Sequence, residues 1–195
     1  MALILASTSP RRRELLGMLG LSFTVLGADI DETMDPRRGA EAEVSRICRA
    51  KAEAVRPLSA AGDIIIAADT IVCVGSRILG KPRSEADAAA MLRLLSGRTH
   101  EVRTGVTVLG DSRCVTEVEE TAVRFRPLQE NEIRAYIESG EPMDKAGAYG
   151  IQGLGSIFVE SILGDYFNVM GLPLCRLSQI LNAFGIAVLG GGKTR

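Results

Sequence analysis

The stretch from Asp63 to Gly75, DIIIAADTIVCVG, most constrains what this chain can fold into. It is dominated by apolar and β-branched residues, and such a continuous run is typical of a strand that is buried on both faces. We therefore expect it to be the central strand of a sheet. Asp69 interrupts the run, and a carboxylate there is costly unless it is paired, binds a metal or lies at the exposed end of the strand. From this stretch alone, a structural and a catalytic Asp69 are equally good interpretations.

Helices and strands alternate irregularly along the rest of the chain. Periodicity, capping residues and glycine stops predict helices at residues 9–20, 40–58, 84–97, 129–139 and 173–184. Apolar and alternating patterns predict strands at residues 3–6, 22–28, 63–75, 100–109, 114–125 and 156–163. The predicted strands at residues 100–109 and 114–125 flank GDSR, and this pattern predicts a β-hairpin. We therefore expect the sheet to contain antiparallel pairs. We therefore predict an α/β fold in which helices flank a mixed β-sheet.

The composition restricts the number of domains and the kinds of ligand. With 195 residues and 46% hydrophobic content, the chain can bury a sizeable core. We predict a single domain at residues 1–189, followed by a disordered tail at residues 190–195. The 23 basic and 24 acidic side chains give a net charge of −1, so no global field attracts nucleic acid or an anionic membrane. Any anion site must be local, and a small anion fits it better than a polymer.

The apolar stretches and the cysteines point to the cytoplasm. The N-terminal MALILAST is too short for a signal peptide and lacks the basic residues of one, and the longest apolar run is too short to span a membrane. Cys48, Cys73, Cys114 and Cys175 are scattered, and His100 is the single histidine. Neither a zinc site nor a disulfide framework is therefore predicted. We expect buried thiols in a reducing cytoplasm and a structural histidine.

The segment STSPRRRELL predicts an anion site at the start of a helix. Ser9 and Pro10 are typical residues of a helix start, yet three arginines follow them. Cations there oppose the positive end of the helix dipole, and a bound anion reverses that cost. Backbone N–H groups, the hydroxyls of Ser7 and Ser9 and the guanidinium groups together favour a phosphate. A solvated basic patch is the alternative interpretation.

Further segments contain candidate ligand contacts. Lys81, in ILGKP, lies in a turn from which a cation can enter a cleft, although a surface lysine is the simpler interpretation. In the glycine-rich DKAGAYGIQGLG, the backbone can approach a ligand, and the Gln152 amide can pair with a nucleobase edge. Asp31, Glu32 and Asp35, in DIDETMD, are solvated by default, but one or two of them would suit a hard cation such as Mg²⁺ that also binds phosphate oxygens. Lys51 is expected to face solvent, as charged helix residues normally do.

In chain order, these segments resemble the Maf family of nucleoside triphosphate pyrophosphatases. The segments are LASTSPRRRELL, DET, RAKA, AADTIV with ILGKP, LSGRTHEVRTGV, DKAGAYGIQG and GDYFNVMGLPL. The resemblance covers residues 3–174. It implies an elongated, two-lobed fold with a central cleft, similar to that of inosine triphosphate pyrophosphatases. It also implies cleavage of a nucleoside triphosphate between the α and β phosphates with a divalent metal cation, Mg²⁺ or Mn²⁺.

The resemblance also implies roles for individual residues. Arg12, Thr70 and Gln152 match the branch of the family that acts on dTTP and UTP, so the implied substrate is a pyrimidine nucleoside triphosphate. The implied substrate-binding residues are Ser7, Arg11, Arg12, Thr70 and Gln152, and the implied catalytic residues are Asp69, Lys81, Lys51 and Glu32. Asp69 either accepts the proton of the attacking water or holds the metal, and Glu32 is the second candidate metal ligand.

The charges of these residues agree with such a substrate. A triphosphate carries about four negative charges, and Arg11, Arg12, Lys51 and Lys81 are the matching cations, which would favour departure of pyrophosphate. The family also suggests an alternative, a nucleotide-binding regulator of cell division and septum formation with little turnover. A nucleic-acid binder is disfavoured by the net charge and by the 4% aromatic content. The resemblance alone favours a homodimer.

Overall fold

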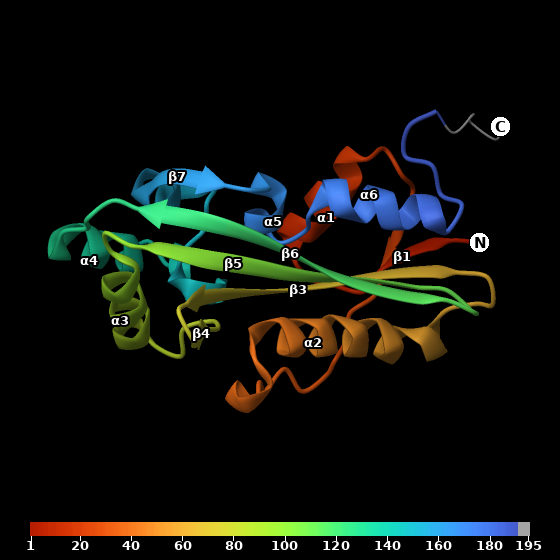
Figure 1. Cartoon of the computed structure of the whole chain (residues 1–195), viewed down its shortest axis with the longest axis horizontal. Coiled ribbons are helices and arrows are strands. Elements are labelled where there is room, and N and C mark those ends of the chain that lie inside the picture. The colour runs from red at the N-terminus through yellow and green to blue at the C-terminus, as the bar shows by residue number, and fades with distance from the viewer. Residues whose placement is uncertain (191–195) are drawn as a thin grey trace.

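The fold is built on one mixed sheet of seven strands. The computed structural model describes residues 1–190, and the predicted tail beyond residue 190 lies outside the described residues. The strands are β1 (Leu3–Leu5), β2 (Thr24–Val25), β3 (Ile64–Val74), β4 (Arg77–Leu79), β5 (Thr99–Leu109), β6 (Cys114–Phe125) and β7 (Val159–Leu163). Their order is β2-β1-β3-β5-β6-β7, and β4 pairs with β3 (Figure 1). β1 is parallel to β2 and β3, and the other pairs are antiparallel, which confirms the predicted mixed sheet.

Strands β3, β5 and β6 run along the long axis of the molecule (Figure 1). β3 and β5 each have 11 residues and β6 has 12, so each strand reaches both ends of the fold. The predicted hairpin is present as β5 and β6. In the middle of the β3–β5 pair, Asp69 lies opposite Gly105, and Thr70 lies opposite Thr104. Asp69 therefore belongs to the central strand, as its sequence context predicts.

The sheet is interrupted beside the middle of β3. β1 pairs with β3 as far as Ile66, and β4 begins to pair with β3 at Val72. Between these points, residues 67–71 have β5 on one side and no described strand on the other. The carbonyl of Ile66 bonds to the chain that leaves β1. Because ladder bonds alternate along a strand, the peptide groups of Ala68 and Thr70 point into this gap.

Helices cover both faces of the sheet. They are α1 (Pro10–Met18), α2 (Ala40–Val55), α3 (Glu85–Leu95), α4 (Glu130–Glu138), α5 (Tyr166–Met170) and α6 (Leu174–Ala183). Short 3₁₀ helices are η1 (Pro36–Arg38), η2 (Arg56–Leu58), η3 (Glu141–Asp144), η4 (Ala146–Ala148) and η5 (Gly153–Phe158). Helix α2 lies along one face, where its apolar side packs on alternate residues of β3 (Figure 1). Helices α1 and α6 pack at one end of the long strands, α3 and α4 pack at the other end, and α5 lies between them against β5 and β6.

Two separate hydrophobic cores lie at the two ends of the face opposite α2. One core joins Ile66 of β3 to the apolar sides of α1 and α6, and the other joins Val72 to α3 and α4. Leu16 and Leu92 are fully buried in the first and the second core. Burial of one such side chain contributes about 1.5–3 kcal/mol. The same three strands therefore support two lobes, and the middle of β3 lies between them.

Several local predictions differ from the structure. The strand expected at residues 22–28 is reduced to β2, and residues 156–158 are 3₁₀ helix instead of strand. The pattern missed β4 and α5, which have 3 and 5 residues, because elements of that length leave little periodicity. Ser9 is in the N-cap position of α1 with an extended backbone, but its side chain makes no capping hydrogen bond.

The four cysteines differ in their exposure. Cys48 and Cys73 are buried, whereas Cys175 is exposed, so the expectation of buried thiols is wrong for Cys175. Within residues 1–190, no helix combines the length and the apolar character that crossing a membrane requires.

Candidate active site

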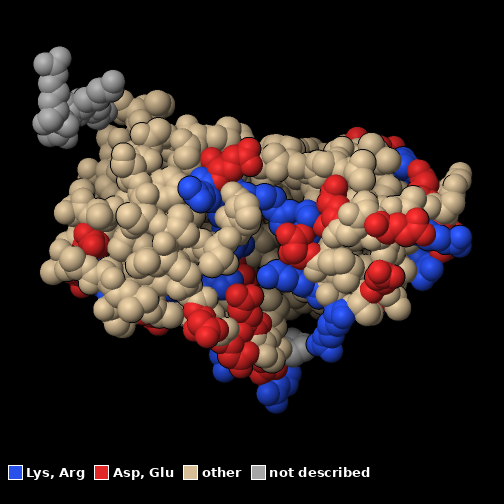
Figure 2. All heavy atoms as spheres, turned by 180° about the vertical axis from the view of Figure 1, so that it is seen from behind, with Lys and Arg blue, Asp and Glu red and all other residues tan. Residues whose placement is uncertain are grey.

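A cavity of about 780 Å³ lies between the two lobes. Figure 2 shows basic and acidic side chains gathered around a hollow in the middle of one face, whereas the broad flank beside it is mostly uncharged. All nine residues that the sequence singled out line this cavity: Ser7, Arg11, Arg12, Glu32, Lys51, Asp69, Thr70, Lys81 and Gln152. The volume is in the range of small-molecule sites. We call the part around Asp69 and Lys51 the charged end, and the part formed by residues 144–153 the loop end.

Lys51 is the central cation of the charged end. Its Nζ lies 2.6 Å from Oδ1 of Asp69 and 2.8 Å from Oε1 of Glu32. Lys51 and Asp69 are 7% and 6% exposed, so the expectation that Lys51 faces solvent is wrong. The amphipathic pattern misleads here because α2 crosses β3 where a buried carboxylate needs a partner. Lys51 is therefore engaged by two carboxylates in this structure and is not a free cation for phosphate.

The glycine opposite Asp69 determines how close α2 comes to the sheet. A Cβ atom at Gly105 would lie 2.9 Å from the Val44 carbonyl oxygen and 2.9 Å from Sγ of Cys48, both in α2. Real Cβ atoms essentially never come that close, so a side chain at Gly105 would push the helix away from β5. The close approach brings Lys51 within hydrogen-bonding distance of Asp69.

The two carboxylates keep oxygen atoms that Lys51 does not use. Burial alone would raise the pKa of Glu32, but the hydrogen bond and the charge of Lys51 lower it below its usual value. Within residues 1–190, no hydrogen bond reaches Oδ2 of Asp69 and no cluster of three or more metal-ligating side chains is present. Mg²⁺ commonly binds through one or two carboxylates together with substrate phosphates and water. Asp69 and Glu32 fit that donor set once a phosphate supplies the remaining oxygens.

Arg12 is fixed by a chain of hydrogen bonds that crosses β3 and β5. Its Nε donates to the Gly171 carbonyl at 2.8 Å, and its Nη2 donates to Oγ1 of Thr70 at 3.1 Å. Thr104 Oγ1 lies 2.9 Å from Thr70 Oγ1 and donates its proton to the Asn168 carbonyl. A hydroxyl has one proton, so Thr70 must donate to Thr104 and accept from Arg12. Thr70 therefore acts in this structure by orienting Arg12.

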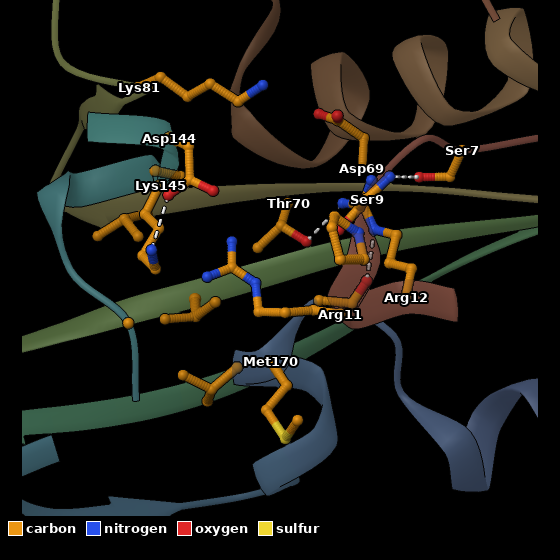
Figure 3. Close-up of a pocket in the computed structure, with 18 of the residues that line it drawn as sticks. Ser7, Ser9, Arg11, Arg12, Asp69, Thr70, Lys81, Asp144, Lys145 and Met170 are labelled. Atoms are coloured by element: carbon orange, nitrogen blue, oxygen red, sulfur yellow. Dashed lines mark hydrogen bonds and ion pairs between the residues drawn. The ribbon is translucent and has the colours of Figure 1, made fainter. Parts of the chain in front are cut away.

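The helix start brings Arg11 and two serines to the cavity. Figure 3 shows that the side chain of Arg11 points away from Asp69 and toward Asp144 and Lys145, so Arg11 and Arg12 reach different parts of the cavity. The backbone N–H of Ser9 donates to Oγ of Ser7 at 3.2 Å. This N–H is one of the groups that the sequence predicts as donors to an anion.

Lys81 enters the cavity from the opposite lobe. It follows β4, and Figure 3 shows its side chain extending toward Asp69. Its charge contributes to the lowered pKa of Glu32, after the larger effects of burial and of Lys51. The turn that the sequence predicts therefore places this exposed lysine in the cleft. The net charge of the charged end is positive.

The loop end consists of 3₁₀ helices and glycine-rich turns. Gln152 lines the cavity there, and no hydrogen bond to its side chain is recorded within residues 1–190. Lys145 donates to Oδ1 of Asp144 at 2.7 Å and lines the same end. Sequence reasoning assigned no role to Asp144 and Lys145, although both belong to the quoted DKAG segment. The signal that could have identified them is their position as adjacent charged residues at the start of a glycine-rich loop.

His100 supports the wall of the loop end. Its Nε2 lies 2.8 Å from the hydroxyl of Tyr149, which lines the cavity, and His100 is 2% exposed. Burial lowers the pKa of His100 from 6.5 to about 4. A neutral, buried histidine bound to a wall residue agrees with the predicted structural role.

The cavity can bind a ligand that is anionic at one end and polar at the other. Guanidinium and ammonium groups, Arg12 and Lys81, face the charged end, where Asp69 keeps one oxygen atom available. The free amide of Gln152 offers a donor and an acceptor at the loop end. Together the fold and the cavity define an α/β protein with a site for a small polyanion that carries a polar group.

Comparison with known proteins agrees with this class. The chain belongs to the Maf family, because the model of that family, described as Maf-like protein, matches residues 2–184. A dTTP/UTP pyrophosphatase of Bacillus cereus is 50% identical over 186 residues, which cover 95% of this chain and 97% of that protein. A dTTP/UTP pyrophosphatase of Bacillus pumilus is 47% identical over 184 residues, which cover 94% of this chain and 97% of that protein.

Two solved structures are more distantly similar. The Ham1 protein of Staphylococcus aureus is 18% identical with a TM-score of 0.46, over 82% of this chain and 80% of that chain. A nucleoside-triphosphatase, also described as a dITP/XTP pyrophosphatase, from Mycobacterium abscessus is 14% identical with a TM-score of 0.46. That match covers 94% of this chain and 97% of the other chain.

Proposed function

We propose that this protein is a pyrophosphatase that hydrolyses dTTP and UTP, with modified pyrimidine analogues as further substrates. The products are the nucleoside monophosphate and pyrophosphate. The observation that carries the proposal is the contact between Asp69 and Lys51 in a cavity that has the cations Arg12 and Lys81 on one side and the amide of Gln152 on the other. The curated relatives that share about half of the residues carry this activity in their names.

The triphosphate lies at the charged end in this proposal. Arg12 and Lys81 bind its oxygens, Ser7 contributes a further donor, and the positive field favours the departing pyrophosphate. Arg11 binds the substrate from the side of Asp144 and Lys145, toward which its side chain points. A water molecule forms a bond to phosphorus while the P–O bond between the α and β phosphates breaks. The proton of that water passes to the free Oδ2 of Asp69 if Asp69 is the base. Lys51 holds Asp69 and Glu32 in place for this step.

A divalent cation, Mg²⁺ or Mn²⁺, is part of the proposal. Asp69 and Glu32 would hold it, and it would neutralise phosphate charge and lower the pKa of a bound water. The two roles of Asp69 differ in one observable. If Asp69 is a metal ligand, its replacement changes the apparent affinity of the enzyme for Mn²⁺. If Asp69 is the base, its replacement changes the acid limb of the pH–rate profile.

The nucleobase lies at the loop end in this proposal. An amide pairs with the alternating donor and acceptor groups of a pyrimidine edge, and the amide of Gln152 lines the cavity there. We also propose a homodimer, which comes from the family alone, and a cytoplasmic location, which comes from the apolar stretches and cysteines of the sequence. Light scattering of the purified protein measures the mass, which for a homodimer is twice that of the chain.

The experiment that tests the function is a turnover assay on several nucleotides. The protein is incubated with dTTP, UTP, CTP, dATP or GTP and Mg²⁺ or Mn²⁺, and the products are separated by ion exchange. We expect monophosphate and pyrophosphate, with dTTP and UTP as the preferred substrates. Release of single phosphates, or equal rates for purines and pyrimidines, contradicts the proposal.

A further inference from the structure

Glu141 lines the cavity beside the loop that carries Gln152. It begins η3, directly after α4, and its carboxylate accepts hydrogen bonds from the loop backbone. Oε2 accepts from the N–H of Leu154 at 2.9 Å, and Oε1 accepts from the N–H of Gly155 at 3.2 Å. The hydroxyl of Tyr136, in α4, donates to the same Oε1 at 2.9 Å. The Glu141 carboxylate thus accepts three hydrogen bonds, and two of them hold the backbone that follows Gln152.

Tyr136 holds the backbone that precedes Gln152 in the same loop. Its hydroxyl gives its one proton to Glu141, so it uses a lone pair to accept the N–H of Gly150 at 3.1 Å. Gln152 lies between the two attachment points. The backbone on both sides of Gln152 therefore depends on one Tyr136–Glu141 pair.

The loop packs so closely against Tyr136 and Glu141 that there is no space for a side chain at Gly153 or Gly155. Gly153 has a φ of 74°, and a Cβ atom there would lie 2.6 Å from Oε2 of Glu141. A Cβ atom at Gly155 would lie 2.5 Å from the Gly150 carbonyl oxygen and 2.7 Å from the Tyr136 hydroxyl. These glycines are thus required by the Tyr136–Glu141 pair as well as by the turn.

The pair also connects to the other polar groups of the loop end. Lys145 donates from Nζ to the backbone carbonyl of Glu141 and to Asp144. Burial alone would raise the pKa of Glu141, but the bonds from the loop backbone and from Tyr136 lower it below its usual value. Glu141 is therefore ionised at neutral pH, when it accepts all of these bonds.

We propose that Glu141 is a positioning residue for nucleobase selection: together with Tyr136 it sets the place of Gln152 at the loop end and leaves triphosphate binding at the charged end unaffected. This inference rests on the proposed function, in which Gln152 pairs with the nucleobase. The competing explanation is that Glu141 only stabilises the fold. In that case its loss would weaken all ligands alike.

The test compares Glu141→Gln and Tyr136→Phe with the wild type. Glu141→Gln keeps the size of the side chain but turns an amide NH₂ toward backbone donors, and Tyr136→Phe removes only the hydroxyl. Glu138→Gln, an exposed glutamate of α4, is the matched control. Steady-state rates are measured for dTTP and dATP. Inorganic tripolyphosphate, which has no nucleobase, is used as a competitive inhibitor.

We expect both loop variants to lower the preference for dTTP over dATP by about tenfold, mainly through the KM for dTTP. The inhibition constant of tripolyphosphate should stay within about twofold of the wild-type value, and Glu138→Gln should change neither quantity. An unchanged preference overturns the inference. A parallel loss of tripolyphosphate binding and dTTP turnover also overturns it, because that result indicates a general defect of the fold.

A second measurement separates this inference from the proposed function. Hydrogen exchange of the Leu154 and Gly155 amides does not depend on turnover. We expect slow exchange in the wild type and faster exchange in Glu141→Gln, with unchanged exchange in β5. Equal exchange overturns the role of Glu141 in holding the loop. A wild-type protein that exchanges as expected but shows no nucleobase preference contradicts the proposed function instead.

Discussion

The two ends of the cavity are built in different ways. At the charged end, Asp69 lies in the middle of an 11-residue strand that is paired with β5 along its length, and α2 rests directly on Gly105 opposite it. At the loop end, Gln152 lies between 3₁₀ helices, and its backbone is held by the Tyr136–Glu141 pair instead of by strand ladders. One end is part of the sheet, and the other is attached to it by a few hydrogen bonds.

This difference matches two different demands. Cleavage of a triphosphate needs the same arrangement of water, phosphorus and charge for every nucleotide, and a stiff scaffold preserves such an arrangement. Nucleobase selection depends on a few hydrogen bonds that differ between substrates. Substitutions at the charged end should therefore affect all nucleotides alike, whereas substitutions at the loop end should change their ranking. The following predictions test that division.

Asp69→Asn should have the largest effect. We expect kcat to fall on the order of a hundredfold or more for both dTTP and dATP, because the variant loses the base or metal ligand. The ratio between the two substrates should stay unchanged. Asp29→Asn, an exposed carboxylate of the neighbouring loop, is the control and should retain the wild-type rate. A normal kcat in the Asp69→Asn variant would indicate that the role of Asp69 is structural.

Thr104→Val should have an intermediate effect. The substitution keeps the shape but removes the acceptor for Thr70 and the donor for the Asn168 carbonyl, so Arg12 loses its fixed orientation. We expect kcat/KM to fall about tenfold for every nucleotide. The free energy of unfolding should fall by about 1–3 kcal/mol.

The control for this prediction is Thr107→Val in the same strand. Thr107 is equally buried, but its hydroxyl contacts Cys48 and Thr116, and it does not line the cavity. We expect a similar loss of stability with little change in kcat/KM. If both variants lower kcat/KM equally, the hydrogen-bond chain to Arg12 has no special role.

His100→Gln should have the smallest effect on turnover and a distinct effect on pH dependence. Because the pKa of His100 is about 4 in the folded protein and 6.5 in the reference state, the unfolded chain binds the proton first as the pH falls. The contribution of neutral His100 is complete above pH 6.5 and is lost between pH 6.5 and pH 4. At pH 5 this loss is about 2 kcal/mol.

Urea unfolding at pH 7 and at pH 5 measures this loss. The wild type should lose about 2 kcal/mol more than His100→Gln over that interval, whatever the stability of the variant at pH 7. Equal losses would mean that His100 titrates normally in the folded protein. Turnover at pH 7 should change little, because the His100 side chain contacts the wall residue Tyr149 and does not itself line the cavity.

The sequence predicts which residues line the site better than it predicts the contacts that hold them. The apolar run around Asp69 identifies the central strand and marks the carboxylate as unusual, and both expectations agree with the structure. Lys51 is misassigned because the pattern of a helix cannot show that a charged position faces a buried partner. Glu141 and Thr104 are missed because each acts through contacts with residues distant in sequence. Local patterns do not encode such contacts.

The gap in the sheet beside β3 leaves peptide groups unpaired without creating an open edge of the sheet. A strand edge with unpaired peptide groups normally invites pairing with another chain. Here the unpaired groups of Ala68 and Thr70 lie between β1 and β4, so a strand from a neighbouring molecule would have to displace one of them. Water and small ligands meet no such obstacle. The protein therefore keeps the peptide group of Thr70, which lines the cavity, away from any open edge of the sheet.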